Sequence, residues 1–366
     1  MENVIIFGAS TKGSMIKRKL EETKKYKVRY FCDNNSKKWK ETLNSIEIIS
    51  IDDVKSLCIN GFEGIIVISV CDQWQVVEQI QNVREVQLPV YGIAWGCINQ
   101  GLEINKVLYY IDITKPYLDY IEYHVSDHCN LKCRGCGHYS NLSEPHFGNL
   151  SKYFNDLKRL KDMFWGIKTI RLMGGEPLLN KELPEFISCT RDIFPDSDIM
   201  VVTNGLLIPN IDEKLLITMY KYFVRFDISL YPPTSRLKEK IELKCIEYNI
   251  DYHFSMPIEI FYDNFNYSGN SDKNIAYEKC GSGHCHFLED GHISVCGLPI
   301  LYKKYQNKLQ YKMEMDENDI INLYDPELDG FKLKELLSKP MQICRYCSDK
   351  EKRYFNWQGN YPYCEN

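Results

Sequence analysis

The chain has 366 residues, 44% of them hydrophobic and 26% charged, which is long enough for two or three domains with cores of their own. Its formal net charge of -5 gives no electrostatic reason to expect a nucleic acid or an anionic membrane as a partner. No apolar stretch is long enough to span a bilayer, and no secretion signal precedes the first strand-like run. Because the chain has 15 cysteines without such a signal, we expect a cytoplasmic protein whose thiols bind metal.

The N-terminal part alternates strand-like and helix-like segments. A β-branched run ends at Gly8, a helix-compatible segment follows, and a second run ends at Asp33; the pattern then repeats, with segments at 4–7, 14–22, 28–32, 64–69 and 74–83. This alternation predicts an α/β module with a parallel sheet over residues 1–105.

The first turn of this module partly matches a dinucleotide-binding fingerprint. Gly8 and Gly13 take the outer glycine positions of G-x-G-x-x-G, but Ser10 stands at the middle one, where glycine lets the backbone approach a pyrophosphate. Asp33 lies where such units place an acidic group for a ribose hydroxyl. The module resembles Rossmann-like modules attached to sugar-modifying enzymes, which leaves two hypotheses, nucleotide or nucleotide-sugar binding and a structural or docking role.

The middle of the chain predicts a parallel barrel or partial barrel over residues 117–275. A helix is expected from Ser151 to Trp165, with Ser151 as its N-cap and Tyr153 and Phe154 in the core. Functional groups of such a barrel collect at the carboxyl ends of its strands. Five strands are clear and a sixth is expected near Ile258–Tyr262; the five lie at 120–125, 168–173, 198–202, 224–228 and 251–255.

Three cysteines follow the first of these strands with the spacing C-x3-C-x2-C: Cys129, Cys133 and Cys136. Three protein thiolates hold three irons of a 4Fe-4S cluster and leave the fourth iron open for another ligand. A zinc site is the alternative, but zinc usually takes paired C-x2-C units separated by a longer loop. The spacing therefore favours a 4Fe-4S cluster with an open iron.

This spacing resembles the signature of the radical S-adenosylmethionine (radical SAM) superfamily. The resemblance implies that SAM chelates the open iron, that an electron from a donor such as flavodoxin or ferredoxin splits it, and that a deoxyadenosyl radical results. The family usually has an aromatic residue before the third cysteine, where this chain has Gly135, and His138 and Tyr139 are the candidates to replace it. The segment from Cys129 to Asn141 also resembles a subgroup associated with bacterial surface polysaccharides.

Two further turns resemble the superfamily's cofactor site. Gly174, Gly175, Glu176 and Pro177 follow a strand and resemble the motif that receives the ammonium group of SAM. Glycines there permit a close backbone approach, and a carboxylate complements the positive charge. Thr203, Asn204 and Ser229 follow the next two strands, where related enzymes contact ribose or carboxylate, although Asn-Gly also forms ordinary turns.

The C-terminal part, residues 276–366, holds a second set of cysteines. Cys285, Cys296, Cys344 and Cys347, with Gly291 between the first two, resemble the twitch domain, a shortened relative of the SPASM domain with one auxiliary 4Fe-4S cluster. Four thiolates would close that cluster. Cys280 is the alternative to Cys285, Cys364 is a possible spare, and a four-cysteine zinc site is the alternative to iron and sulfur.

These expectations predict a radical SAM oxidoreductase acting on a small molecule, either a carbohydrate or a nucleotide sugar. Dehydrogenation is favoured, with the auxiliary cluster accepting an electron; epimerisation is its chemical rival, with Cys280 or Cys364 as hydrogen donor. A maturase of a ribosomally made peptide and a zinc-bearing binding protein without catalysis are the competing hypotheses. The sequence identifies no residue that takes or gives the proton of the substrate.

Overall fold

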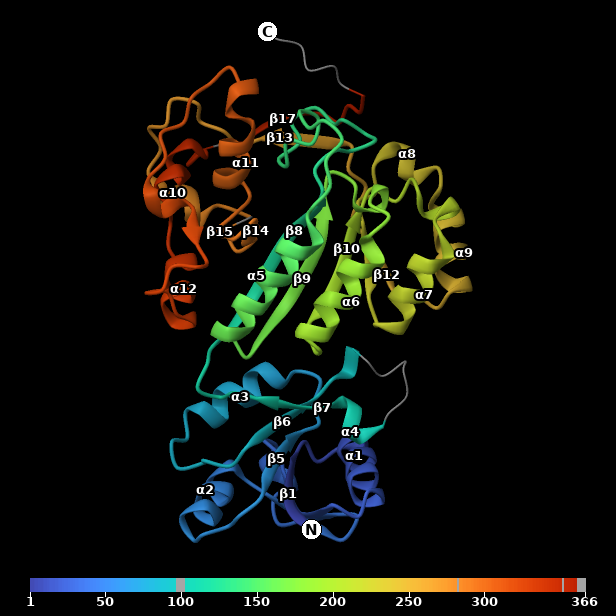
Figure 1. The fold of residues 1–366 in the computed structure, drawn as a ribbon, viewed down its shortest axis with the longest axis vertical. Coiled ribbons are helices and arrows are strands. Elements are labelled where there is room, and N and C mark those ends of the chain that lie inside the picture. Colours follow the sequence, from blue (N-terminus) through green and yellow to red (C-terminus); the bar gives the residue numbers. More distant parts are fainter. Residues whose placement is uncertain (97–102, 282, 351, 361–366) are drawn as a thin grey trace. The chain divides into compact units, whose positions relative to one another are not determined.

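The computed structural model describes residues 1–96, 103–281, 283–350 and 352–360, and it divides into two compact units, Met1–Tyr117 and Leu118–Asn366 (Figure 1). The predicted ranges 117–275 and 276–366 lie within one compact unit rather than two. The reason is that strands from both ranges join a single sheet. No helix in the described ranges is long and apolar enough to cross a membrane.

The N-terminal unit has a seven-stranded sheet in the order β3-β4-β2-β1-β5-β6-β7. Neighbours from β4 to β6 pair in parallel, as predicted, and the edge strands β3 and β7 pair antiparallel. The sheet continues past the predicted boundary at residue 105. Its strands are β1 Glu2–Phe7, β2 Tyr26–Cys32, β3 Thr42–Leu43, β4 Ile46–Ile49, β5 Ile65–Ile68, β6 Val90–Ile93 and β7 Leu108–Ile111. Its helices are α1 Thr11–Glu22, α2 Ile51–Ile59, α3 Gln73–Gln81 and α4 Ile104–Val107.

The second unit has an eight-stranded sheet in the order β12-β11-β10-β9-β8-β14-β15-β16, and β9 to β12 pair in parallel. The α/β class with a partial barrel is therefore confirmed. The first strands are β8 Tyr117–Ser126, β9 Gly166–Gly174, β10 Asp198–Thr203, β11 Arg225–Ile228 and β12 Tyr252–Phe254. The helices between them are α5 Leu150–Met163, α6 Leu183–Ile193, α7 Glu213–Lys221, α8 Pro232–Ser235 and α9 Lys238–Glu247.

The remaining strands extend this sheet on the other side of β8. β14 pairs in parallel with β8, and β15 and β16 continue antiparallel. The elements of this part are α10 Lys273–Glu278, β14 Phe287–Glu289, β15 His292–Ser294, α11 Leu298–Tyr305, β16 Ile321–Asn322 and α12 Gly330–Leu337.

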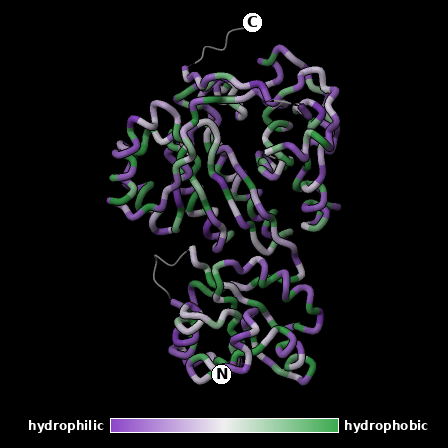
Figure 2. Tube along the Cα trace, turned by 180° about the vertical axis from the view of Figure 1, so that it is seen from behind, coloured by the Kyte–Doolittle hydropathy of each residue, from purple (hydrophilic) through white to green (hydrophobic). Residues whose placement is uncertain are grey.

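Side chains alternate between the two faces of this sheet. Ile121, Leu172, Val201 and Phe226 point toward the hydrophobic core that they share with residues of α5, α6 and α7, which cover that face in Figure 1. Figure 2 shows the unit from behind, with hydrophilic segments along the strands. Because successive side chains of a strand point to opposite faces, the face away from α5, α6 and α7 is left for polar side chains.

Two local predictions were wrong. α5 begins at Leu150, and its N-cap is Asn149 rather than Ser151, because the Asn149 side chain accepts a hydrogen bond from the Lys152 N–H at 3.0 Å. Phe154, expected in the core, is 41% exposed, since it lies on the outer side of that helix.

The sixth barrel strand predicted near Ile258–Tyr262 does not join the large sheet. β13, Ile260–Asp263, forms a separate two-stranded sheet with β17, Arg353–Asn356. Aromatic residues of the two strands pack in pairs, Phe261 with Phe355 and Tyr262 with Tyr354, and this cross-strand packing fixes the pairing. β14 takes the position next to β8 instead.

Candidate functional site

The three clustered cysteines lie in the loop that follows β8. Burial raises the pKa of the Cys133 thiol to about 12, and the thiolates of Cys136 and Cys129 raise it further, so the three sulfurs act on one another. Burial also raises the pKa of Cys129 to about 11, although the Leu131 N–H, 3.4 Å from its sulfur, lowers it. Metal binding must therefore deprotonate these thiols.

Within the described ranges, no three His, Cys, Asp or Glu side chains are gathered tightly enough to hold one metal ion. A 4Fe-4S cluster differs from a single ion because each cysteine binds a different iron, so its ligands lie further apart. Three thiols in one loop, with a backbone N–H already directed at a sulfur, fit such a cluster.

The turn after β9 packs directly beneath the cysteine loop. Gly175 N–H donates to the Ser126 carbonyl at 2.8 Å, and Glu176 N–H donates to the His128 carbonyl at 3.0 Å. A Cβ on Gly174 would lie 1.9 Å from the Ser126 oxygen, and one on Gly175 would lie 2.3 Å from the His128 oxygen. Both positions therefore require glycine, as the sequence predicted from the need for a close backbone approach.

The Glu176 carboxylate links this turn to the turn after β10. Its Oε1 accepts hydrogen bonds from the Thr203 hydroxyl at 2.6 Å and the Leu178 N–H at 3.1 Å, and its Oε2 accepts one from the Asn204 N–H at 2.9 Å. Burial raises the pKa of Glu176 to about 7, and these hydrogen bonds partly offset that effect. Glu176 therefore holds two predicted cofactor turns together.

Asn204 extends this connection to the cysteine loop. Its Nδ2 donates to Asn130 Oδ1 at 2.6 Å and lies 3.7 Å from the sulfur of Cys129. The cysteine loop, the Gly174-Gly175-Glu176 turn and the Thr203-Asn204 turn thus meet at the carboxyl edge of one sheet. Residues 123–247, which contain all three, match the sequence profile of the Radical SAM superfamily. These residues therefore form a radical SAM domain. A domain of this family implies a 4Fe-4S cluster and SAM.

The curated relatives match this chain over a limited region. The chain is 38% identical over 109 residues to the GTP 3',8-cyclase of Nautilia profundicola, which is 29% of this chain and 33% of that protein. It is 34% identical over 130 residues to the GTP 3',8-cyclase of Aliarcobacter butzleri, which is 35% of this chain and 39% of that one. The chain therefore spans about a third of the length of these relatives.

Solved structures match parts of the chain at low identity and low TM-score. BtrN in complex with AdoMet and 2-DOIA is 18% identical with a TM-score of 0.38, over 64% of this chain and 94% of that one. UDP-D-quinovosamine 4-dehydrogenase from Vibrio fischeri is 22% identical with a TM-score of 0.26, over 31% of this chain and 95% of that one. The family assignment depends on the sequence match and not on these scores.

The other predicted cofactor residues lie at the same edge of the sheet. Pro177 is buried in the turn that Glu176 begins, and Ser229, at the end of β11, donates its N–H to the Thr203 carbonyl at 2.9 Å. The structure thus brings together Gly174, Gly175, Glu176, Pro177, Thr203, Asn204 and Ser229, and their contacts with SAM stay predictions.

The sequence did not predict two aromatic residues at the cysteine loop. Trp357 donates its indole N–H to the sulfur of Cys133 at 3.3 Å, and its ring stacks on Tyr231 with centroids 5.6 Å apart. Burial raises the pKa of Tyr231, and the thiolates of Cys133 and Cys136 raise it further. Tyr231 follows β11 at the functional edge, so its position was a usable signal, whereas nothing in the sequence connects Trp357 to Cys133.

The two residues expected to replace the missing aromatic ring have other partners. His138 Nδ1 lies 2.9 Å from His124 Nε2, and the Tyr139 hydroxyl lies 2.9 Å from the Tyr311 hydroxyl. Tyr139 is buried in the hydrophobic core. Phe355 instead occupies the space beside Gly135, since a Cβ there would lie 2.6 Å from the ring.

The C-terminal cysteines divide into a group of four and one outlier. Burial raises the pKa of Cys296 well above its ordinary value, and the thiolates of Cys347, Cys344 and Cys280 raise it further. Burial raises the pKa of Cys347 to about 12, again with contributions from Cys280 and Cys344. The four thiols of Cys280, Cys296, Cys344 and Cys347 therefore lie close enough to act on one another.

Cys285, the residue predicted as the first ligand, has different surroundings. Burial raises the pKa of its thiol, the Glu122 carboxylate raises it further, and a hydrogen bond with Tyr120 lowers it. These two residues belong to β8, and the Cys280 thiolate raises the pKa of Cys285 as well. Cys285 therefore lies beside β8 and near Cys280, but Cys285 does not contribute to the raised pKa of Cys296, Cys344 or Cys347. Cys364 lies outside the described residues.

The sheet face opposite α5, α6 and α7 carries polar side chains on several strands. Arg171 on β9 pairs with Asp227 on β11 at 3.0 Å, and His253 on β12 lies 3.1 Å from the same carboxylate. On β8, the Tyr120 hydroxyl donates to Glu122 at 2.9 Å. This inner face is partly open to solvent and presents both hydrogen-bond donors and acceptors.

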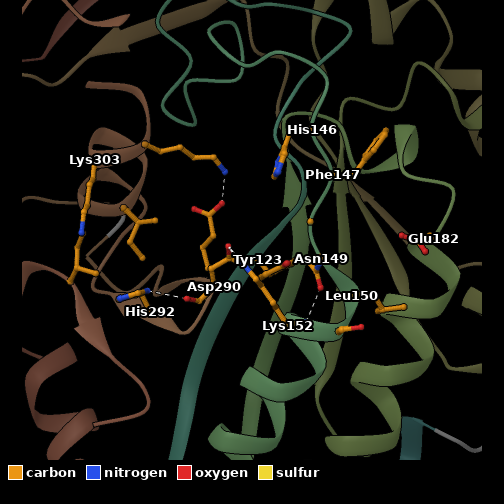
Figure 3. Close-up of a pocket in the computed structure, with 16 residues that line it drawn as sticks. Tyr123, His146, Phe147, Asn149, Leu150, Lys152, Glu182, Asp290, His292 and Lys303 are labelled. Atoms are coloured by element: carbon orange, nitrogen blue, oxygen red, sulfur yellow. Dashed lines mark hydrogen bonds and ion pairs between the residues drawn. The ribbon is translucent and has the colours of Figure 1, made fainter. Parts of the chain in front are cut away.

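The second unit also has a cavity of about 860 Å³ (Figure 3). His146, Asp290 and Lys303 line it together with Asn149 and Lys152 at the start of α5. Lys152 pairs with Asp290 at 2.8 Å across this space. None of the predicted cluster or SAM residues lines the cavity, so we do not place the radical chemistry there.

In the predicted nucleotide-binding turn of the N-terminal unit, the acidic side chain is already bound by protein groups. Gly8 has a φ of +118°, which favours glycine, and the Ala9 N–H donates to Asp33 Oδ2 at 2.9 Å. Lys38 pairs with the same oxygen at 2.9 Å. Asp33 therefore stabilises the turn, and a ribose hydroxyl would have to share its carboxylate with Lys38.

Proposed function

We propose that the protein is a cytoplasmic radical SAM oxidoreductase that removes hydrogen from a small hydroxylated substrate, a carbohydrate or a nucleotide sugar. The observation that carries the chemistry is the hydrogen-bonded connection from Glu176 through Asn204 to the cysteine loop. Cys129, Cys133 and Cys136 would hold the catalytic 4Fe-4S cluster, which supplies the electron for SAM cleavage when bound. An electron donor such as flavodoxin or ferredoxin would reduce the cluster.

The proposed substrate class is supported by the polar inner face of the sheet. Arg171, Asp227 and His253 offer hydrogen-bond donors and acceptors on β9, β11 and β12, which suit a molecule rich in hydroxyl or phosphate groups. Dehydrogenation of a carbon that bears a hydroxyl would transfer one hydrogen atom to the deoxyadenosyl radical. Loss of a proton to solvent and of an electron to the proposed auxiliary cluster would then convert the substrate radical into a carbonyl group.

The proposed auxiliary 4Fe-4S site consists of Cys280, Cys296, Cys344 and Cys347. Their mutual effects on pKa support this set over the one that contains Cys285. A variant with both Cys344→Ala and Cys347→Ala tests whether this site takes part in oxidation. If that variant folds, cleaves SAM and still forms the full amount of oxidised product, a redox role of the site is wrong.

A second candidate substrate is GTP, because the curated relatives are named GTP 3',8-cyclase. The match covers about a third of each relative, so the parts that select the substrate can differ. If the N-terminal unit binds nucleotides, both a nucleotide sugar and GTP would be suitable ligands. Calorimetry of the full chain with a nucleotide sugar and with GTP tests this binding.

The deciding experiment is anaerobic turnover with SAM and dithionite on sugars, nucleotide sugars, GTP and peptides that carry deuterium at their carbon atoms. Deuterium in deoxyadenosine would identify the substrate and its reacting position. Solvent deuterium at that position without a change in oxidation level would establish epimerisation and contradict dehydrogenation. A modified peptide would contradict the small-molecule proposal, and a colourless protein with zinc but no iron or sulfide would contradict radical chemistry altogether.

A further inference from the structure

The C-terminal segment 353–360 lies along the cysteine loop. Arg134 N–H donates to the Gln358 carbonyl at 2.9 Å, and Asn360 N–H donates to the Leu131 carbonyl at 2.6 Å. These bonds flank Cys133, whose sulfur accepts the indole N–H of Trp357 at 3.3 Å. The segment therefore follows the loop over several residues instead of touching it at a single point.

Phe355 fills the space that a side chain at position 135 would need. Gly135 has a φ of +67°, a conformation that favours glycine, and a Cβ there would lie 2.6 Å from Cζ of Phe355. The guanidinium of Arg134 lies over the same ring, 4.9 Å from its centroid. The absence of an aromatic side chain between Cys133 and Cys136 thus coincides with a ring that arrives from the C-terminal segment.

Two contacts fix Trp357 in place. Its backbone N–H donates to the Glu259 carbonyl at 2.8 Å, and this bond continues the pairing of β13 with β17. Its indole ring stacks on Tyr231 at an interplanar angle of 22°. Arg353 also pairs with Asp263 across these two strands at 2.5 Å. The indole N–H is therefore directed at Cys133 by a supported strand and not by a free chain end.

We propose that Trp357 is a positioning residue of the catalytic cluster, which donates its indole N–H to the Cys133 sulfur and raises the reduction potential of the cluster. Reduction adds negative charge that spreads onto the sulfurs, and hydrogen bonds to those sulfurs stabilise the reduced form. Phe355 and Tyr231 form the aromatic wall that the cysteine motif itself lacks. This inference rests on the proposed function, because it requires a cluster on Cys129, Cys133 and Cys136.

Trp357→Phe tests the hydrogen bond, because phenylalanine keeps an aromatic ring beside Tyr231 but has no N–H. Tyr354→Leu is the matched control, since Tyr354 lies on β17, three residues before Trp357, is 69% exposed and packs on Tyr262. The reduction potential is measured on reconstituted protein by a redox titration of the paramagnetic signal that changes when SAM is added. We expect a negative shift in Trp357→Phe and none in Tyr354→Leu.

A second measurement needs no cluster. In the apoprotein, Cys133 is buried and the indole N–H lies 3.3 Å from its sulfur. Truncation of the ring in Trp357→Ala should therefore expose the thiol and raise the rate of Cys133 alkylation by iodoacetamide severalfold, whereas Tyr354→Leu should leave the rate unchanged. If Trp357→Ala does not fold, Trp357→Phe decides the question through its potential. Equal reduction potentials in wild type and Trp357→Phe would overturn the inference about Trp357. If the wild type still cleaves SAM in that case, the proposed function is not affected. A wild type that binds no iron overturns both.

Discussion

The carboxylate of Glu176 accepts the backbone N–H of Asn204 at 2.9 Å, and this bond joins the turn after β9 to the turn after β10. Because the Asn204 side chain also reaches Asn130 and Cys129, one buried carboxylate organises all three loops of the proposed site. The role expected for Glu176 from the sequence was contact with the ammonium group of SAM. The structure gives it three protein donors as well, which changes what its removal should do.

Replacing Glu176 with alanine should weaken SAM binding by about tenfold or more, because the donors of Thr203 and Asn204 lose a charged acceptor and the turns separate. The three cysteines remain, so the iron content should not change. Calorimetry of the reconstituted protein with SAM measures the affinity. Glu185→Ala is the control, since that carboxylate pairs with Lys214 on the outside of α6. Unchanged SAM affinity in Glu176→Ala would contradict the assignment.

Replacing Cys133 with alanine should abolish the formation of deoxyadenosine, since the catalytic cluster loses one of its three protein ligands. The same result is expected for Cys129 and Cys136. Cys189→Ala, on α6 and half-buried, should retain activity. The assay is chromatography of products after anaerobic incubation with SAM and dithionite, and deoxyadenosine from Cys133→Ala at the rate of the wild type would show that the loop does not hold the cluster.

Replacing Cys280 with alanine should remove the auxiliary cluster, whereas Cys285→Ala should keep it. The iron content should therefore fall from about eight to about four atoms per chain in the first variant only. Iron and sulfide analysis of the reconstituted proteins measures this difference. If Cys285→Ala lost the iron and Cys280→Ala retained it, the assignment drawn from the sequence would be right and the one drawn from the structure wrong.

The stability of the protein should depend on the protonation of Glu122. Burial raises its pKa to about 7 from an ordinary value of 4.5, so the folded state binds this proton more tightly than the unfolded state. The stabilisation that comes from protonated Glu122 is complete below pH 4.5 and is lost as the pH rises through 7. Between these values the free energy of unfolding should fall by about 3 kcal/mol from this group.

Glu122→Gln tests this dependence, because the amide oxygen can still accept the Tyr120 hydroxyl but does not titrate. Unfolding of wild type and variant is followed at intervals from about pH 5 to pH 8. The wild type should lose stability relative to Glu122→Gln over this range, and Glu239→Gln, an exposed substitution on α9, should follow the wild type. Parallel curves for wild type and Glu122→Gln would contradict the raised pKa.

Most of the proposed catalytic loop could be read from the sequence because its parts are local. Cys129, Cys133 and Cys136 lie in one turn, so their spacing alone indicates three ligands for one cluster. Gly174 and Gly175 were recognised for a similar reason, since the motif and the end of β9 adjoin in the chain. The alternation of strand-like and helix-like segments likewise predicted the parallel sheets, because buried strands are recognisable in the sequence as short runs of β-branched and apolar residues.

The sequence alone determined the α/β class, the radical SAM domain and the place of the predicted cofactor turns at strand ends. Only the tertiary structure decided the contacts between residues far apart in the chain. Trp357 reaches Cys133 across 224 positions because β13 pairs with β17 instead of joining the large sheet. Cys280, rather than Cys285, acts on Cys296, Cys344 and Cys347, which no spacing reveals. Local geometry is encoded by neighbouring residues, whereas these contacts depend on the path of the whole chain.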